Sequence, residues 1–442
     1  MSLRTPTSVR KLQRALYTKA KTEPGFRFYT LWDKVWREDV LREAWRRCRA
    51  NGGSAGVDRV GFADIEAEGV EAWLGNLQEE LRSKQYRPRP LLRVWIPKAS
   101  GGQRPLGIPT IRDRVVQTAM VLVLGPVFEA DLLPQQYGFR PKLDAKLAVR
   151  RVYFHVKENG RRDVIDADLS NYFNTIPHGP LMKCVARRIS DRQILSVVKM
   201  WLQTPVTEGR GPRAPTIAEA RRSKRGTPQG GVISPLLSNL YFRRFVLAWR
   251  ELGAARETKG AIVNYADDFV ICCPAGRGEA AMKWMRRIML ALGLTVNEDK
   301  TRLVRLPDER FDFLGYTVGR FYGKDGRSYI GTAPSKRAVQ RVCRKVHEET
   351  SRRWTVTPVE KRVAEVNAIL RGWCNYFDQG PVFQAYRVVR QYTERRLRRW
   401  LMMKHHKGRG TGYRQYPDEH LYETLGLYRP WTKSRGPSRA KV

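Results

Sequence analysis

Two adjacent carboxylates, Asp267 and Asp268, stand between two short apolar runs, Ala261 to Val263 and Phe269 to Cys273. The runs are rich in strand-forming residues and too short to span a membrane, so they predict two buried strands joined by a turn. A carboxylate buried at such a corner needs a partner or a metal ion. The alternative is an exposed Asp-Asp turn without a function, and the rest of the chain has to decide between the two.

A third carboxylate, Asp168, ends another apolar run, which begins at Val164 and predicts a strand. Asp166 and Asp168 then share one face, because strand side chains alternate with period two. If Asp168 meets Asp267 and Asp268, the three carboxylates repel one another and need divalent cations between them. Oxygen ligands favour Mg²⁺, and two ions about 4 Å apart promote in-line attack at phosphorus. The expected cofactor is therefore a pair of Mg²⁺ ions, which Mn²⁺ could replace.

Lys98 and Arg104 flank a Gly-rich turn in the stretch from Val94 to Pro109, which predicts strand, turn and strand. Two cations across a hairpin can converge on a triphosphate, although solvated loop charges are the alternative. A second Gly-rich segment, Gly226-Thr-Pro-Gln-Gly-Gly231, leads into Ser234-Pro235, a pair typical of a helix start. Such a loop can bind an anion, or be only a turn. Together with the carboxylates, these groups indicate nucleotidyl transfer, in which a 3′-hydroxyl attacks an α-phosphate and pyrophosphate leaves.

The charge balance of the chain is unusual. Of 442 residues, 83 are Lys or Arg and 43 are Asp or Glu, which gives a net charge of +40. Such a balance indicates a polyanionic partner, usually nucleic acid. A membrane is disfavoured because no apolar run approaches the length of a span, and there is no signal-peptide core. The six cysteines form no CxxC pair and are expected to be buried and reduced. We expect a cytoplasmic protein, in the bacterial cytosol or nucleoid.

Residues 1–50 are basic and rich in Trp, with a partial apolar stripe through Leu31, Val35 and Leu41. This pattern predicts an amphipathic helix that packs on the next domain and leaves its arginine face free for phosphate. The loop after Tyr137 has Arg140 and Lys142 available. Further helices are expected over Asp64 to Leu81, Arg112 to Phe128, 181–203 with Arg187 and Arg188 at the surface, Leu236 to Trp249, and Glu279 to Leu292.

After about residue 330 the chain becomes helical and strongly basic. In Ser335 to Glu349, apolar and cationic residues form separate stripes of one helix. A second helix is expected to start at the capping box Thr357-Pro358-Val359-Glu360 and to stop at Gly372, and a third to run from Phe383 to Met403. Residues 404–442 are expected to be irregular and to face RNA. The RNA-binding candidates on these helices are Arg337, Arg341, Arg344, Lys345, Arg395, Arg396, Arg398 and Arg399.

Seven ordered blocks resemble those of reverse transcriptases, in particular the group II intron-encoded branch. Tyr265-Ala-Asp-Asp268 resembles the catalytic box, and Gly226 to Leu240 resembles the block before it. Arg371-Gly-Trp-Cys-Asn-Tyr-Phe377 resembles a signature of the maturase, or thumb, domain. The resemblance runs from about residue 50 to 400. The other blocks are Arg104 to Thr110, Tyr137 to Arg140, Asp168 with Phe173, Leu294 to Asn297, and Phe313 to Tyr316.

The resemblance implies an α+β right-hand polymerase, in which fingers and a palm with an antiparallel sheet precede an α-helical thumb. The expected domains are a basic N-terminal helical extension at 1–50, reverse transcriptase fingers and palm at 51–325, a thumb or maturase domain at 326–405, and a basic C-terminal segment at 406–442. No Cys/His cluster similar to the HNH endonuclease of longer relatives is present, so a short form is expected.

Site roles follow from the resemblance. Asp168, Asp267 and Asp268 would be catalytic and would hold the two Mg²⁺ ions, with Asp166 one layer behind them. Lys98, Arg104 and Gln229 would contact the incoming dNTP. Phe173 would be the sugar gate, because its ring under the ribose clashes with a 2′-hydroxyl. Primer or template contacts are expected from Tyr265, Ala266, Phe313, Leu314, Gly315 and Tyr316.

The expected function has two parts. The first is RNA-directed DNA polymerase activity that copies intron RNA into cDNA. The second is a maturase role, in which the protein binds intron RNA to assist splicing and retrohoming, a form of retrotransposition. The expected partners are RNA, target or primer DNA, and dNTPs, without a membrane. Two alternatives stay open: a domesticated relative that acts in DNA repair or CRISPR spacer acquisition, and an RNA-binding splicing cofactor without polymerase activity.

Overall fold

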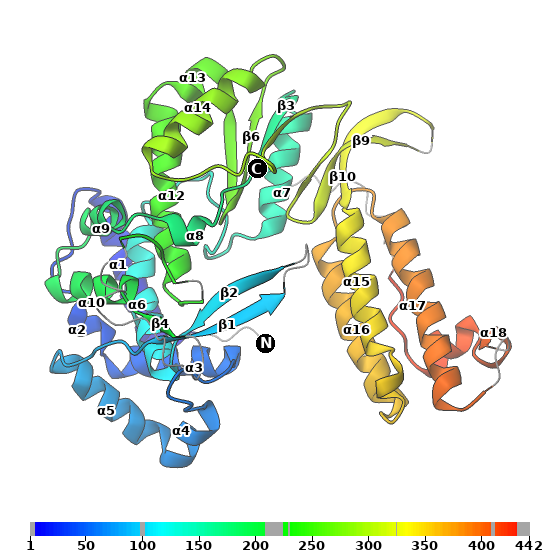
Figure 1. The fold of residues 1–442 in the computed structure, drawn as a ribbon, viewed down its shortest axis with the longest axis horizontal. Helices are drawn as coiled ribbons and strands as arrows, with labels where there is room; N and C mark the ends of the chain where they lie inside the picture. The colour runs from blue at the N-terminus through cyan, green and yellow to red at the C-terminus, as the bar shows by residue number, and fades with distance from the viewer. Residues whose placement is uncertain are drawn as a thin grey trace. The chain divides into compact units, whose positions relative to one another are not determined.

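The computed structural model describes residues 5–97, 102–207, 224–228, 230–323, 325–407 and 412–430 (Figure 1). Lys98, Gln229 and most of the loop from 207 to 225 lie outside these residues, as does the side chain of Arg104. The fold is α+β, as predicted, because helices alternate with three small sheets.

The strands form sheets with the orders β2-β1-β4, β5-β6-β3-β7 and β10-β9-β8. The predicted strand-turn-strand around residue 100 is confirmed, since β1 and β2 pair antiparallel with Arg93 opposite Gly107 and Ile96 opposite Arg104. The bounds are β1 (Leu91–Pro97), β2 (Gln103–Ile108), β3 (Asp163–Ala167), β4 (Val206–Thr207), β5 (Ala261–Tyr265), β6 (Asp268–Cys273), β7 (Arg302–Arg305), β8 (Phe311–Phe313), β9 (Tyr316–Tyr322) and β10 (Ser328–Pro334).

The helices before residue 300 are α1 (Thr7–Thr22), α2 (Trp32–Val35), α3 (Glu38–Asn51), α4 (Phe62–Glu68), α5 (Val70–Arg82), α6 (Ile111–Glu129), α7 (Ala145–Lys157), α8 (Tyr172–Thr175), α9 (His178–Ala186), α10 (Arg192–Leu202), α12 (Ser234–Glu251), α13 (Ala254–Thr258) and α14 (Gly278–Ala291). Those after it are α15 (Lys336–Glu349), η1 (Arg352–Trp354), α16 (Val359–Tyr376), α17 (Phe383–Lys404), α18 (Gly412–Gln415) and η2 (His420–Thr424).

The chain divides into two compact units. The first comprises Met1–Asp144, Ala167–Ile271 and Glu279–Arg302, and the second comprises Ala145–Asp166, Cys272–Gly278 and Leu303–Val442. No helix in the described part of either unit is long and apolar enough to cross a membrane.

Helix α6 forms the core of the first unit. It is apolar around most of its circumference, which is typical of a helix buried on all sides, and residues such as Val115, Val116 and Met120 are fully buried. Helices α1, α2 and α3 pack against it. Thr110 caps its start, because the Thr110 hydroxyl accepts a hydrogen bond from the Asp113 amide.

The arginines of α3 are paired with carboxylates, so the prediction of a free arginine face is wrong for this helix. Glu43, almost fully buried, pairs with Arg46 at 2.6 Å and with Arg47 at 2.7 Å. Arg42 pairs with Glu71 at 2.8 Å, and Arg49 with Glu66 at 2.5 Å. The predicted packing on the next domain is confirmed, since α3 lies against α6. These four arginines therefore form ion pairs within the N-terminal region.

The single helix predicted over 181–203 is two helices, α9 and α10, and the second is capped by Asp191. Arg187 is exposed as predicted, but Arg188 is only 1% exposed. The Arg188 guanidinium donates hydrogen bonds to carbonyl oxygens at and beyond the end of α1, including those of Ala20 and Glu23. Carbonyls at a helix end lack partners within the helix, and this buried arginine supplies them.

The second unit contains a bundle of α15, α16 and α17 around a common apolar core. Ser335 caps α15, because its hydroxyl accepts a hydrogen bond from the Ala338 amide at 3.2 Å. The predicted capping box of α16 is wrong: the helix begins at Val359, and no side chain caps it. The predicted stop at Gly372 is also wrong, because α16 continues to Tyr376 and so buries Cys374.

The prediction of an irregular end is wrong for part of residues 412–430, because helical turns span Gly412–Gln415 and His420–Thr424. Leu421 and Leu427 are buried in the same core as the three helices. Asn367 of α16 fixes this segment, since its side chain donates to the Gly426 carbonyl at 2.8 Å and accepts from the Tyr428 amide at 2.6 Å. This part of the C-terminal segment is therefore a component of the bundle.

Candidate active site

The predicted hairpin around Asp267 and Asp268 is confirmed as β5, a two-residue turn and β6. Ala266 in the turn has a positive φ of 60°, which only a few non-glycine residues adopt. The buried Asn264 side chain stabilises this turn by donating to the Ala266 carbonyl at 2.8 Å. Both aspartates are exposed at the tip.

The loop from Tyr137 to Arg140 packs against this hairpin. The Tyr137 amide donates to the Asn264 carbonyl at 2.8 Å. Gly138 allows the close approach, because a side chain at this position would collide with the backbone of Ala266. Arg140 was predicted to be available for a ligand, but it pairs with Glu129 at 2.6 Å and donates to nearby carbonyls. That prediction is therefore wrong. The loop thus supports the hairpin from behind.

Asp168 directly follows β3 and is held by the segment after Val296. The Asp168 amide donates to the Thr301 hydroxyl at 3.2 Å, and the Asp168 carbonyl accepts from the Asn297 amide at 2.9 Å. The carboxylate, whose side chain is 35% exposed, accepts from Asn297 Nδ2 at 2.9 Å and lies 3.3 Å from Lys300 Nζ. The sequence predictions did not assign roles to Asn297, Lys300 and Thr301, although Asn297 ends one of the recognised blocks.

Two observations relate Asp168 to the hairpin. Strands β3 and β6 are neighbours in one sheet; Asp168 follows the first, and Asp268 begins the second. In addition, burial raises the pKa of the Tyr172 hydroxyl, and the charges of Tyr241 and Asp267 raise it further. Tyr172 lies four residues after Asp168, so the Asp267 charge acts on the turn that follows Asp168.

The donor chemistry fits a hard cation, because carboxylate oxygens are the ligands that Mg²⁺ prefers. Within the described ranges, however, no three His, Cys, Asp or Glu side chains lie close enough together to hold a metal ion. The Asp168 carboxylate is instead bound to Asn297 and Lys300. Asp166 is partly buried.

Phe173 connects the Asp168 segment with the Gly-rich loop. Its ring is 8% exposed and packs edge-on against Tyr172, with 5.7 Å between the ring centroids. Its carbonyl accepts a hydrogen bond from the Thr227 amide at 2.7 Å. The loop that carries Gln229 therefore starts beside the residue predicted to be the sugar gate.

The same loop also touches the β1–β2 hairpin. Gly230 has a φ of 110°, and a side chain there would collide with the Gly107 carbonyl of β2. Helix α12 follows. The Ser234-Pro235 pair predicted Ser234 as its N-cap, but the N-cap is Ile233. The Ser234 hydroxyl turns back and donates to the Pro228 carbonyl at 2.8 Å. The structure thus brings together the segments that carry Phe173, Gln229 and Arg104.

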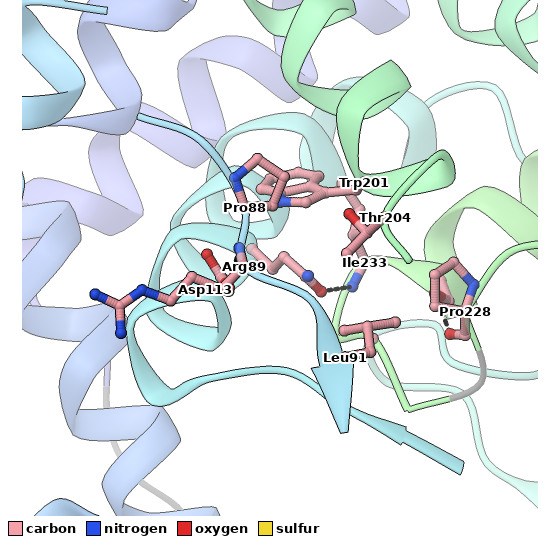
Figure 2. Close-up of a pocket in the computed structure, with 11 residues that line it drawn as sticks. Pro88, Arg89, Leu91, Asp113, Trp201, Thr204, Pro228 and Ile233 are labelled. Carbon is pink, nitrogen blue, oxygen red and sulfur yellow. Dashed lines mark hydrogen bonds between the residues drawn. The ribbon is translucent and has the colours of Figure 1, made fainter. Parts of the chain in front are cut away.

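A small cavity lies where the loop meets the base of the hairpin (Figure 2). Its volume of about 10 Å³ holds at most one water molecule. Gln117 of α6 reaches across and accepts a hydrogen bond from the Ile233 amide at 3.3 Å. The contact is therefore closely packed and offers no room for a substrate.

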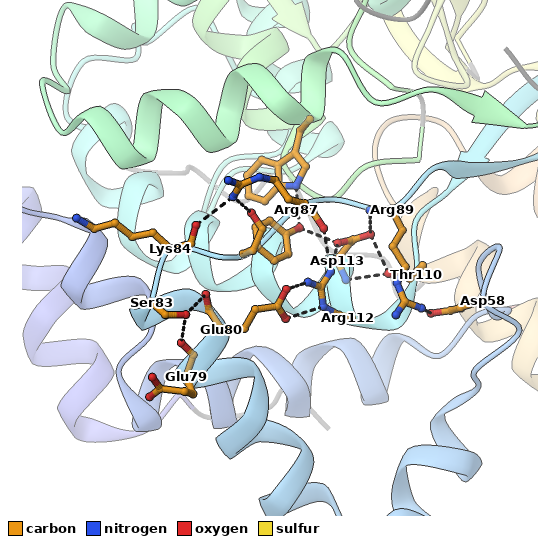
Figure 3. A network of polar contacts seen from close by, with 12 residues as sticks. Asp58, Glu79, Glu80, Ser83, Lys84, Arg87, Arg89, Thr110, Arg112 and Asp113 are labelled. Carbon is orange, nitrogen blue, oxygen red and sulfur yellow. Dashed lines mark hydrogen bonds and ion pairs between the residues drawn. The ribbon is translucent and has the colours of Figure 1, made fainter. Parts of the chain in front are cut away.

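Asp113 holds the base of the hairpin, and the sequence predictions missed it (Figure 3). The buried carboxylate accepts hydrogen bonds from the Tyr86 hydroxyl at 2.7 Å, the Thr110 hydroxyl at 2.8 Å and the Arg89 amide at 3.1 Å. Arg89 precedes β1 and Thr110 follows β2, so one side chain fixes both ends. Burial raises the pKa of Asp113, and these hydrogen bonds and Arg112 oppose that rise. The pattern Thr110-x-x-Asp113 at a helix start is the signal that could have found it.

In the second unit, the block from Phe313 to Tyr316 packs on α16. Leu314 and Gly315, both with positive φ, form the turn between β8 and β9. The Tyr316 hydroxyl donates to the Tyr376 carbonyl at 2.5 Å, and the Tyr376 hydroxyl donates to the Leu314 carbonyl at 2.8 Å. The predicted primer-supporting turn is thus tied to the segment that resembles the maturase signature.

The eight RNA-binding candidates differ in their surroundings. Arg396 donates to the hydroxyl and carbonyl of Thr350, and Arg398 donates to the Tyr416 carbonyl and pairs with Asp418. These two arginines therefore hold the bundle together. The remaining six are exposed: Arg337, Arg341, Arg344, Lys345, Arg395 and Arg399.

Comparisons with known proteins identify the family of the chain. Residues 96–318 match the family described as reverse transcriptase (RNA-dependent DNA polymerase), and residues 339–416 match the maturase-specific domain of group II introns. The chain therefore belongs to the reverse transcriptases, which are RNA-directed DNA polymerases, and it is of the type that also carries a group II intron maturase domain.

Three relatives illustrate the range. The chain is 34% identical to Protein YkfC of Escherichia coli over 75% of its own length and 93% of that protein. It is 28% identical to the group II intron-encoded protein LtrA of Lactococcus lactis over 50% of its length and 35% of LtrA. It is 29% identical to the retron Mx65 reverse transcriptase of Myxococcus xanthus over 54% of its length and 55% of that enzyme.

Proposed function

We propose that the chain copies intron RNA into DNA by two-metal nucleotidyl transfer, with Asp168, Asp267 and Asp268 as the Mg²⁺ ligands. The observation that carries the proposal is the arrangement of one sheet: Asp168 follows β3, and the neighbouring strand β6 begins at Asp268, next to the exposed Asp267. When bound, the two ions activate the attacking hydroxyl and stabilise the leaving oxygen.

The residues of the chain supply the rest. Asn297 orients the Asp168 carboxylate, and the Lys300 ammonium offsets its charge. Lys98, Arg104 and Gln229 bind the triphosphate, and Phe173 excludes a 2′-hydroxyl. In this proposal residues 51–325 act as the fingers and palm and residues 326–405 as the thumb. The turn from Phe313 to Tyr316 contacts the primer or template, as do Tyr265 and Ala266.

The test replaces Asp168 and a matched aspartate in the same region. Asp168→Ala should reduce primer extension on an RNA template about a thousandfold or more, because metal ions contribute several kcal/mol and each 1.36 kcal/mol is tenfold in rate. The control is Asp299→Ala, since Asp299 is exposed and the Asp168 carboxylate is bound by Asn297 and Lys300 instead. Wild-type extension by Asp168→Ala would refute the proposal.

We further propose that the chain acts as a maturase, which binds intron RNA to assist splicing and retrohoming. The match of residues 339–416 to the maturase-specific domain supports this role, as do the exposed cations of α15 and α17. A domesticated enzyme of DNA repair or spacer acquisition would use the same catalytic residues. Whether the coding frame lies within a structured intron RNA or beside a repeat array distinguishes these settings.

A further inference from the structure

A concave pocket of about 500 Å³ lies between α9 and α12, and no residue that lines it belongs to the site described above. Its apolar surface comes from leucines, including Leu240, Leu247 and Leu292. Four cations also line it: Lys183, Arg187, Arg243 and Arg244. An apolar surface beside several cations is suited to a ligand that is anionic at one end and flat and apolar at the other.

The cations of this pocket differ from the arginines of α3. In the part of the chain that the structure describes, no carboxylate lies within ion-pair distance of any of the four. The two acids that line the pocket are already paired elsewhere, since Asp131 lies 3.4 Å from Arg188 and Glu251 lies 3.2 Å from Arg250. The charges of Asp131 and Glu251 do reach Arg243 and oppose the fall that burial causes in its pKa. The four cations nevertheless outnumber these two acids, so the pocket keeps a positive net charge.

Neutral groups hold two of the guanidinium groups in position. Arg243 Nε donates to the Asp131 carbonyl at 2.7 Å, and Arg244 lies over the Tyr241 ring, 5.4 Å from its centroid. The positive charges act on the same region. Burial lowers the pKa of Arg243, and the charge of Arg187 lowers it further. Burial raises the pKa of Cys184, and the charges of Arg187, Arg243 and Arg244 oppose that rise. Preorganised guanidinium groups are well suited to phosphate.

We propose that this pocket binds one nucleotide unit of an RNA strand, with its phosphate on the arginines and its base against the leucines. The inference rests on the proposed function in one respect, that RNA is the partner of the chain. RNA is favoured over an acidic protein because the site is a pocket of single-nucleotide size, and because phosphodiester contacts match guanidinium groups. The net charge of +40 favours the same class of partner.

The first test neutralises the two exposed cations, which are the least coupled to folding. Lys183→Gln with Arg187→Gln should weaken binding of an unstructured single-stranded RNA and lower the slope of log affinity against log salt by about 0.7, the value for one lost phosphate contact on a single strand. The matched control is Lys199→Gln with Lys283→Gln, which removes the same charge from exposed helix positions outside the pocket. A wild-type slope in the pocket variant would overturn the proposal.

The second test uses Cys184, which lines the pocket and is partly exposed. In a Cys343→Ser background, which removes the other partly exposed cysteine, the same RNA should slow alkylation of Cys184 by a maleimide severalfold. A poly-glutamate peptide of equal charge should not. Protection by both polymers, or by neither, would overturn the assignment to RNA.

Both tests are independent of the polymerase assignment. The pocket variant should extend a primer at the wild-type rate when primer and template are saturating, because it lacks no residue of the catalytic site. A wild-type salt slope in the pocket variant, together with normal extension, would refute only the pocket. Normal extension by Asp168→Ala would refute only the proposed chemistry.

Discussion

At the scale of single residues, two side chains hold Asp168, the proposed metal ligand, in place. Asn297 binds both the carbonyl and the carboxylate of Asp168, so it restrains the rotation of the side chain. Lys300 lies 3.3 Å from the same oxygen, Oδ2. Groups that orient a metal ligand in this way affect affinity and activity without touching the ion.

Replacement of Asn297 by Ala should therefore raise the Mg²⁺ concentration needed for half-maximal primer extension by about 10-fold to 100-fold. The measurement is a Mg²⁺ titration of single-nucleotide incorporation. Glu298→Ala is the matched control, because Glu298 is exposed and pairs with Arg286 away from Asp168. An unchanged Mg²⁺ requirement in Asn297→Ala would show that Asn297 does not position the ligand.

At the scale of elements, the β1–β2 hairpin depends on the start of α6. Asp113 accepts from donors on both sides of the hairpin, and its carboxylate is buried. Asp113→Asn replaces one acceptor oxygen with a donor that faces hydroxyl and amide donors. We expect a loss of about 1–3 kcal/mol in the free energy of unfolding, the usual cost of an unsatisfied buried polar group.

The measurement for Asp113→Asn is urea unfolding, combined with the KM for dNTP, which should rise because the hairpin carries Lys98 and Arg104. Glu66→Gln is the control, since the ion pair of Glu66 with Arg49 is exposed to solvent and should contribute little to stability. Equal stability of the two variants would mean that the Asp113 network does not anchor the hairpin.

Helix α17 carries two classes of arginine, which a matched pair of double variants separates. Arg395→Gln with Arg399→Gln changes exposed cations and should lower the salt slope of RNA binding by about 0.7 to 0.9 for each lost phosphate contact. Arg396→Gln with Arg398→Gln breaks contacts to Thr350 and Tyr416 and should lower the melting temperature instead. The reverse pattern would contradict this division of roles.

At the scale of the whole molecule, local patterns were enough to predict the elements that carry the site. Short runs of apolar and turn residues predict three of these elements. They are the hairpin of Asp267 and Asp268, the strand before Asp168, and the strand-turn-strand around residue 100. The helices of the basic bundle could be predicted from their apolar periodicity. Their ends could not be predicted in this way. Helix α16, for example, continues past Gly372 because its packed face continues.

Partners that are distant in the sequence could not be predicted. Asn297 and Asp168 are 129 positions apart, and nothing in either segment indicates that one binds the other. Arg188 and Arg140 look like surface cations, but tertiary structure places each against backbone carbonyls. The charge of an arginine is visible in the sequence, whereas its counter-charge depends on the fold, which is why the N-terminal arginines were expected to be free.

The proposed separation of catalytic aspartates from RNA-binding cations has a direct consequence for the whole protein. Catalysis is assigned to three aspartates, and RNA binding to cations elsewhere, so the two activities should separate. The central claim is that the carboxylates at the β5–β6 turn act only in DNA synthesis.

The most direct measurement compares two readouts in Asp267→Ala with Asp268→Ala: primer extension on an RNA template, and affinity for the same RNA at fixed salt. Primer extension should fall about a thousandfold or more, while the dissociation constant for RNA should change less than about threefold, since the substitutions remove no positive charge. Retained DNA synthesis, or loss of RNA binding in parallel with synthesis, would contradict the account.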